Sequence, residues 1–181
     1  MKKLLFLFFP LYLHAQNVPI GNWKDYLSYN SASYIAEADD RIYCVANGGL
    51  FFIQKKDGTI NRLSKITGLS DIGVKQVAYS YELDIIIITY ENCNIDLLTG
   101  NHVINLSDIK RKGVSGIKII NNVTIKGNMA YLSSSLGLIV IDLINAEIKD
   151  TYSVVGQNEG AIINGCAFLG DSIIVATTNG L

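Results

Sequence analysis

Short apolar runs separated by small polar turns follow one another along most of this chain, a pattern typical of antiparallel β-strands. The turn at Lys56-Asp57-Gly58 lies between two such runs, and Asp-Gly in this position favours a β-hairpin. The pattern predicts three groups of four strands and one pair, at 33–37, 42–45, 50–54 and 59–64; at 74–79, 85–89, 95–98 and 103–106; at 123–126, 130–133, 138–143 and 148–154; and at 163–168 and 173–177. No segment has a convincing helical period, and we interpret residues 104–113 as a connector.

These groups form a repeat in which an apolar strand and a polar turn are followed by Gly-Leu or its equivalent. The repeat is anchored, about every 43–45 residues, at Gly49, Asn94, Gly137 and Gly180. A period of about 40–50 residues made of several short strands is typical of β-propeller blades. We therefore predict an all-β fold, a β-propeller of four-stranded antiparallel blades near residues 31–71, 72–116, 117–160 and 161–181.

The repeat accounts for about three complete blades and the first two strands of a fourth. Propellers protect their sheet edges by closing into a ring, and six to eight blades of this period would need roughly 260–340 residues. We therefore expect this partial propeller, residues 16–181, to be a fragment of a larger ring or the product of a truncated gene model.

Four residues are predicted to have structural roles. Gly49, Gly137 and Gly180 each begin a third strand, where a side chain would crowd the next blade or the turn needs positive φ. Small residues at 46–49 and 133–135 are expected on the innermost strands. Trp23 belongs to an aromatic segment that we expect to close the ring, although a partner-binding strip is the alternative.

The N-terminus reads as a secretory signal peptide at residues 1–15. Lys2 and Lys3 precede ten mainly apolar residues, and Ala15 fits the position before a cleavage site. The apolar stretch is too short to span about 30 Å of hydrocarbon. Export through the Sec pathway is therefore expected. The formal net charge of −1 becomes more negative without the leader, so nucleic acid binding has no electrostatic support.

No catalytic, cofactor-binding or metal-binding residue is predicted. His102, the one histidine after the leader, lies in no HExxH or triad-like pattern. The three cysteines lack CxxC spacing, so neither a thiolate metal site nor a disulfide is required; they are Cys44, Cys93 and Cys166. The basic run 110–112 is either a solvated loop or a contact for an anion or partner.

Two Leu-Ser-Asp-Ile strings, at 69–72 and 106–109, fall in the predicted connectors between blades. Ser and Asp in such loops commonly bond nearby backbone amides, which is the structural interpretation of the strings. Connectors also line one face of a propeller, so a binding role is the alternative.

Several longer strings resemble one known family, the PorZ subunits of the type IX secretion system. They are IGNWKDYLSYN at 20–30, GGLF at 48–51, RLSK at 62–65, TGLSD at 67–71, NLSDIKRK at 105–112 and EIKDTY at 147–152. Propellers of the two-component-regulator type share the Gly-Leu-Phe element, but are not expected to share the Trp23 segment or the connector strings. The resemblance covers nearly all of the chain after the leader.

The resemblance implies tandem seven-bladed propellers followed by a β-sandwich, within the cell-surface attachment complex of Bacteroidota. That complex joins secreted cargo to anionic lipopolysaccharide, with a PorU-like sortase and PorV-like and PorQ-like outer-membrane proteins as partners. The PorZ-like subunit is implied to present the lipopolysaccharide without a catalytic motif. We therefore expect a non-enzymatic scaffold that passes through the periplasm to the outer-membrane surface.

Two alternatives belong to other functional classes. One is the periplasmic ligand-sensing propeller of a hybrid two-component system, which a transmembrane span and a kinase helix downstream would identify. The other is a propeller lyase or glycosidase, which would need paired carboxylates or a His/Tyr centre facing the channel. The residues expected on the inner strands are instead Ala, Asn, Ser and Thr.

Overall fold

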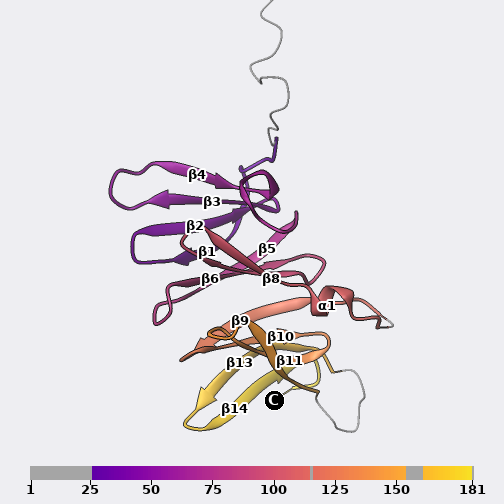
Figure 1. Ribbon diagram of the computed structural model, residues 1–181. Helices are drawn as coiled ribbons and strands as arrows, with labels where there is room; N and C mark the ends of the chain where they lie inside the picture. Colours follow the sequence, from indigo (N-terminus) through magenta and orange to yellow (C-terminus); the bar gives the residue numbers. More distant parts are fainter. Residues whose placement is uncertain (1–25, 115, 154–160, 181) are drawn as a thin grey trace, which may run out of the picture.

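The computed structural model describes residues 26–114, 116–153 and 161–180, which form a stack of small antiparallel sheets (Figure 1). Within these residues there are three four-stranded sheets and one two-stranded sheet. Each sheet is a meander in which strands consecutive in sequence are neighbours in space. The all-β fold of propeller blades predicted from the repeat is thereby confirmed. The signal peptide expected at residues 1–15 and Trp23 lie outside the described residues.

The strands follow the predicted apolar runs closely. The first blade contains β1–β4, at Ala32–Glu37, Arg41–Ala46, Gly49–Gln54 and Ile60–Leu63. The second contains β5–β8, at Val74–Ser80, Ile85–Tyr90, Ile95–Thr99 and His102–Leu106. The third contains β9–β12, at Ile120–Lys126, Met129–Ser134, Gly137–Asp142 and Glu147–Tyr152. The fourth contains β13 and β14, at Ile163–Leu169 and Ser172–Thr177.

Two short helices lie in the connectors between blades. The 3₁₀ helix η1, Lys65–Thr67, has Ser64 as its N-cap, with Ser64 Oγ accepting the N–H of Ile66. The single-turn helix α1, Asp108–Arg111, falls inside the segment interpreted as a connector. Neither helix of the described part of the chain has the length and apolar character needed to cross a bilayer.

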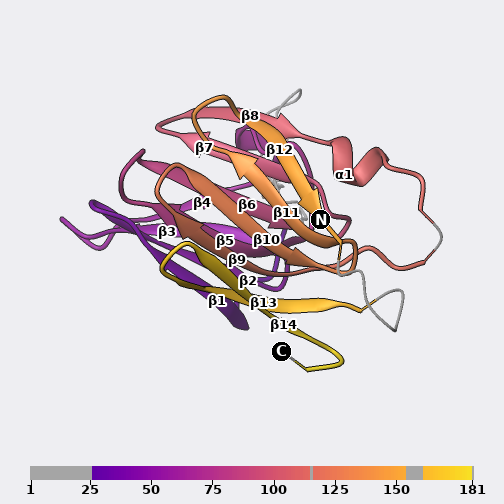
Figure 2. The same ribbon diagram turned by 90° about the horizontal axis from the view of Figure 1, so that it is seen from below.

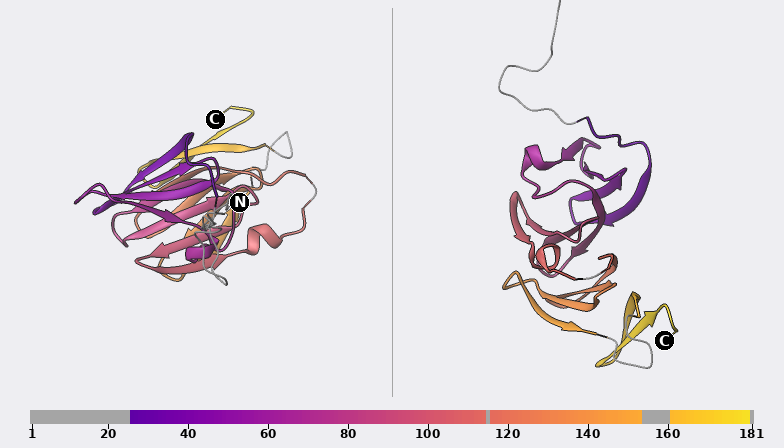
Figure 3. Two further views of the ribbon diagram at one scale, coloured as in Figure 1. Left: turned by 90° about the horizontal axis from the view of Figure 1, so that it is seen from above. Right: turned by 90° about the vertical axis from the view of Figure 1, so that its right-hand side faces the viewer.

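The innermost strands are the first strands of the blades, which corrects the expectation for 46–49 and 133–135. β1 packs against β5, β5 against β9 and β9 against β13, and the blades follow an arc in the right-hand view of Figure 3. Ser133 and Ser134 end β10, the second strand of blade 3. Ala46 ends β2 and Gly49 begins β3, and Asn47 and Gly48 form the turn between them. Asn47 and Gly48 both have positive φ there, 47° and 73°, as a type I′ hairpin requires.

Burial on both faces explains the uninterrupted apolar sequence of β6. Ile86 and Ile88 point into the core between blades 1 and 2, whereas Ile85 and Ile87 point into the core between blades 2 and 3. All four side chains are buried. In Figure 2, which looks along the stack, the sheets overlie one another, and the two core clusters show that a middle strand meets apolar neighbours on each side. Because the connectors join consecutive blades, this packing determines the positions of the two ends of each connector.

Candidate functional site

The interblade connectors and the turns between second and third strands lie at the same end of the antiparallel blades, which we call the connector face. At this face Asp71, in the first connector, accepts hydrogen bonds from Lys110 Nζ (2.6 Å), Asn92 Nδ2 (2.8 Å) and the Ile72 N–H (3.0 Å). Lys110 belongs to α1 in the next connector. The ion pair therefore links two consecutive connectors across blade 2.

The charge on Asp71 is stabilised by these donors. Its side chain is only 11% exposed, and burial alone raises the pKa of a carboxyl group. The hydrogen bonds from Lys110, Asn92 and the Ile72 N–H outweigh burial and lower the pKa of Asp71 to about 2. Asp71 is therefore ionised at neutral pH and serves as a fixed anchor for Lys110.

A second buried carboxylate, Asp96 in β7 of blade 2, also holds the first connector. Asp96 accepts hydrogen bonds from the Ser70 N–H (2.8 Å), Tyr90 Oη (2.6 Å) and Asn105 Nδ2 (2.8 Å). Burial, followed by the bond to Asp96, raises the pKa of Tyr90 far above its usual range. Sequence reasoning missed this group, since the one available signal was a single Asp inside an otherwise apolar strand.

The two Leu-Ser-Asp-Ile strings are not equivalent in space. Asp71 is buried and bonds a backbone amide, as the structural interpretation predicts. Asp108 is exposed and pairs instead with Arg111 of its own helix, at 3.0 Å. In the basic run, Lys110 and Arg111 are thus paired, while Lys112 has no ion pair within the described residues.

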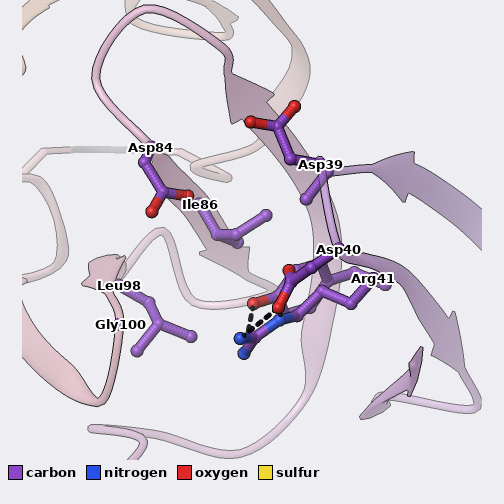
Figure 4. A pocket seen from close by; sticks show the side chains of 9 residues that line it. Asp39, Asp40, Arg41, Asp84, Ile86, Leu98 and Gly100 are labelled. Carbon is purple, nitrogen blue, oxygen red and sulfur yellow. Dashed lines mark hydrogen bonds and ion pairs between the residues drawn. The ribbon is translucent and has the colours of Figure 1, made fainter. Parts of the chain in front are cut away.

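The opposite face carries a small polar cavity between blades 1 and 2 (Figure 4). Asp39 and Asp40 come from the β1–β2 turn, Arg41 begins β2, and Asp84 comes from the β5–β6 turn. Arg41 Nε lies 2.8 Å from Asp40 Oδ1, and Tyr79 Oη donates to Asp84 Oδ1 at 2.9 Å. Burial and this bond raise the pKa of Tyr79 to about 12.

The cavity volume is about 120 Å³, well below the about 300–1,000 Å³ of small-molecule pockets. Asp40 is neutralised by Arg41, and Asp84 is engaged by Tyr79. Across the described ranges, no three His, Cys, Asp or Glu side chains gather as metal ligands would. The cavity is best explained as a polar junction between two blades.

The inner strands are joined by a polar contact that sequence reasoning did not foresee. Gln76 Nε2 donates to Tyr34 Oη (2.9 Å) in blade 1 and to Asn122 Oδ1 (3.2 Å) in blade 3. One amide thus connects three consecutive blades. The only indication in the sequence was that Gln76 is a polar residue in the apolar run 74–79, and this does not predict which residues it contacts.

The three predicted structural glycines meet different constraints. Gly137 has a φ of 114°, and a Cβ there would collide with the carbonyl oxygen of Tyr152. Gly180 has a φ of 112° but open space around it. Gly49 has no positive φ; a Cβ there would lie 2.7 Å from the ring of Tyr29. Their structural roles, like that of Trp23, stay predictions.

The remaining candidates for chemistry lie apart from these clusters. His102 is exposed at the start of β8, where it pairs with Thr99 of β7, and its side chain forms no hydrogen bond or ion pair with any described residue. All three cysteines are free; Cys44 and Cys93 are buried, and Cys166 is partly exposed. Burial raises the pKa of the Cys44 and Cys93 thiols. Within the described residues, neither His102 nor any of the three cysteines forms part of a nucleophile–base pair.

Comparison with known proteins identifies the family. Residues 42–181 match the family model described as the N-terminal β-propeller domain of PorZ of the type IX secretion system (TSS9). The chain belongs to the PorZ N-terminal β-propeller family. The membership predicted from the Trp23 segment, the Gly-Leu-Phe element and the connector strings is thereby confirmed. No curated protein sequence matches the chain.

Solved structures place this PorZ-family chain among propellers. PorZ of Porphyromonas gingivalis, described as an essential bacterial surface component of the type IX secretion system, is 30% identical with a TM-score of 0.77. The match covers 83% of this chain and 20% of that one, so this chain spans about a fifth of the length of that PorZ.

Two further structures share the fold alone. The computationally designed Ika4 protein is 10% identical with a TM-score of 0.62, and the match covers 85% of this chain and 90% of Ika4. The extracellular domain of a hybrid two-component system from B. thetaiotaomicron is 12% identical with a TM-score of 0.62, over 81% of this chain and 20% of that one.

Proposed function

We propose that this PorZ-family propeller is a non-catalytic scaffold of the type IX secretion attachment complex, acting at the outer-membrane surface after export. The observation that carries the proposal is the family match over residues 42–181, together with 30% identity to a surface component of that secretion system. In this role the propeller helps to present anionic lipopolysaccharide to a PorU-like sortase, beside PorV-like and PorQ-like outer-membrane proteins.

The use made of the buried carboxylates supports a scaffold rather than an enzyme. The carboxylate oxygens of Asp71 and Asp96 accept hydrogen bonds from donors 2.6–2.8 Å away, and these bonds hold the connectors in place. A catalytic acid or base needs a pKa close to the working pH, whereas the pKa of Asp71 is about 2. These groups join the first connector to blade 2 and to the second connector, an arrangement that suits docking of a partner.

Complementation of a deletion strain tests the proposal. Full-length wild-type protein should restore attachment of secreted cargo to lipopolysaccharide, and the deletion strain should translocate cargo without attaching it. His102→Ala should behave as wild type, since a scaffold needs no neutral-pH acid–base group. Trp23→Ala should reduce attachment, because the Trp23 segment is predicted to close the ring and removal of a large aromatic packing contact typically costs about 3–5 kcal/mol.

The outcome against the proposal is specific. If His102→Ala abolishes attachment while the protein stays folded and reaches the cell surface, the scaffold function is wrong. The sensor alternative predicts a different result, namely normal attachment in the deletion strain and a lost transcriptional response. At 12% identity, the two-component neighbour supports the shared fold and gives the sensor alternative no further weight.

A further inference from the structure

An open groove lies on the outer side of the junction between blades 2 and 3, and we call it the interblade groove. Its floor is apolar and is formed by Ile109 of α1, Leu136 of the β10–β11 turn, Ile139 of β11 and Ile148 of β12. Lys112 and Thr151 stand at its rim. The cavity volume is about 220 Å³. Water in such a groove is displaced favourably by an apolar group.

Another groove, between blades 1 and 2 and lined in part by Gly100 and Asn101 of the β7–β8 turn, is largely filled. Its volume is only about 90 Å³, because Phe52, Leu63 and Val103 pack against the core there. Leu69 of the first connector is buried beside them. The two grooves therefore differ in volume, and the connector that follows blade 2 contributes Ile109 and Lys112 to the interblade groove.

The rim of the interblade groove offers an unpaired positive charge. Asp108 is the one carboxylate among the described residues that line the groove, and that carboxylate is paired with Arg111 at 3.0 Å. Lys112 has no ion pair in the described part of the chain. Lys118 adds a second cation at the same end of α1, where its Nζ donates to the carbonyl oxygens of three residues, Ile109, Lys110 and Lys112.

The size and position of the groove favour an inserted side chain. Small-molecule pockets usually measure about 300–1,000 Å³, so about 220 Å³ suits one aliphatic or aromatic group rather than a whole ligand. β12 is the outermost strand of its sheet and contributes Ile148 and Thr151 to the groove, and its outer edge pairs with no other described strand. An extended polypeptide can run along such an edge and place alternate side chains in adjoining hollows.

We propose that the interblade groove is the docking site for an extended segment of a partner protein. The segment inserts one large apolar side chain over Ile139 and Ile148, and an adjacent Asp or Glu of the segment pairs with Lys112. The inference rests on the scaffold function proposed above, because a scaffold acts through contacts of this kind. It does not involve lipopolysaccharide.

Peptide selection on the purified full-length protein tests the inference. Phage-displayed 12-residue peptides are selected on wild-type protein, and the enriched sequences are synthesised and their dissociation constants measured by fluorescence anisotropy. Enriched peptides should pair a large apolar residue with a neighbouring Asp or Glu. Lys112→Glu, which reverses the rim charge, and Thr151→Arg, which fills the groove from an exposed position, should each weaken binding at least about tenfold.

Matched controls come from the filled groove and from another exposed lysine. Asn101→Arg changes an exposed residue at the groove between blades 1 and 2, and Lys56→Glu reverses the charge of an exposed lysine in the β3–β4 turn. Both should bind the peptides within about twofold of wild type. Equal binding to all four variants, or enriched peptides without an acidic residue, would overturn the inference.

Two other occupants give distinct outcomes that also overturn it. If dodecanoate competes with every peptide in proportion to chain length, the groove binds acyl chains. If Thr151→Arg converts a wild-type dimer to a monomer in sedimentation analysis, the occupant is a second copy. If no peptide binds but wild-type protein restores cargo attachment, the docking site is rejected and the scaffold function is retained. If peptides bind as expected but wild-type protein does not restore attachment, only the scaffold function is rejected.

Discussion

Replacing Asp71 by Asn should destabilise the propeller at neutral pH by removing the charge that holds Lys110. The carboxylate is 11% exposed and lies 2.6 Å from Lys110 Nζ, and the bond joins the two connectors on either side of blade 2. The amide of the variant could still accept a bond from Asn92, but it could not form an ion pair. The connector that carries α1 would lose its main tie to the first connector.

The magnitude follows from the pKa of Asp71, which is lowered from 3.8 to about 2 because donors outweigh burial. One pKa unit corresponds to about 1.4 kcal/mol, so complete coupling would be worth roughly 2.5 kcal/mol. Lys110 is 41% exposed, and solvent screening reduces the value. We therefore expect Asp71→Asn to lower the free energy of unfolding by about 1–2 kcal/mol at pH 7.

The sign of the pH dependence is also determined. Since the folded-state pKa of Asp71 is lowered, the unfolded chain binds more protons in acid, and the Asp71 contribution is complete above about pH 5. It is lost as the pH falls toward the folded-state pKa of about 2. The difference between wild type and Asp71→Asn should shrink over this range, because the variant lacks the titrating group.

Urea denaturation at pH 7, 5, 4 and 3 measures this difference, with Asp108→Asn as the matched control. Asp108 pairs with Arg111 at 3.0 Å, but both side chains are more than 60% exposed. Exposed i,i+3 pairs contribute only about 0.5 kcal/mol or less. If Asp71→Asn costs no more than Asp108→Asn at pH 7, or if its cost does not depend on pH, the reasoning is refuted.

Three other results are expected. Gly137→Ala should lower the melting midpoint more than Gly180→Ala, because both positions have φ near 113° but only Gly137 faces a carbonyl oxygen; equal shifts would remove the packing explanation. Tyr90→Phe should cost about 1–2 kcal/mol through the lost bond to Asp96, measured by urea denaturation, and a neutral effect would contradict it. A thiol reagent should label native protein first at Cys166, which is partly exposed whereas the other two cysteines are buried; an unchanged fast phase in Cys166→Ser would refute this.

The strand pattern could be predicted because each blade repeats the same local chemistry. The run 85–89 is apolar at nearly every position since two neighbouring blades cover its two faces, and β6 occupies Ile85–Tyr90. The turn at 56–58 contains Gly58, whose φ is 72°, a backbone conformation that Gly adopts without strain. Periodicity and turn chemistry are local properties, so they can be read without knowing which blades meet.

The connector network could not be predicted, because its members are distant in sequence. Asp71 and Lys110 are 39 residues apart, and Gln76 and Asn122 are 46 apart. Such pairs depend on the angle between blades, which the repeat pattern does not specify. The innermost strand was assigned wrongly for a related reason. Small residues mark both tight turns and crowded strands, and at 46–49 the structure shows the turn.

The glycine anchors show why function should be sought where the repeat is broken. Gly137 needs positive φ and empty space, whereas Gly49 needs only room for the ring of Tyr29, so one recurring motif serves different packing requirements. Because the recurring glycine meets different packing requirements in different blades, the motif indicates blade structure and does not indicate a binding site. The connector after blade 2 departs from the repeat by adding α1, its basic residues and the opening above Ile139. Blade packing does not require these features, and for that reason the docking site proposed above is placed at this connector.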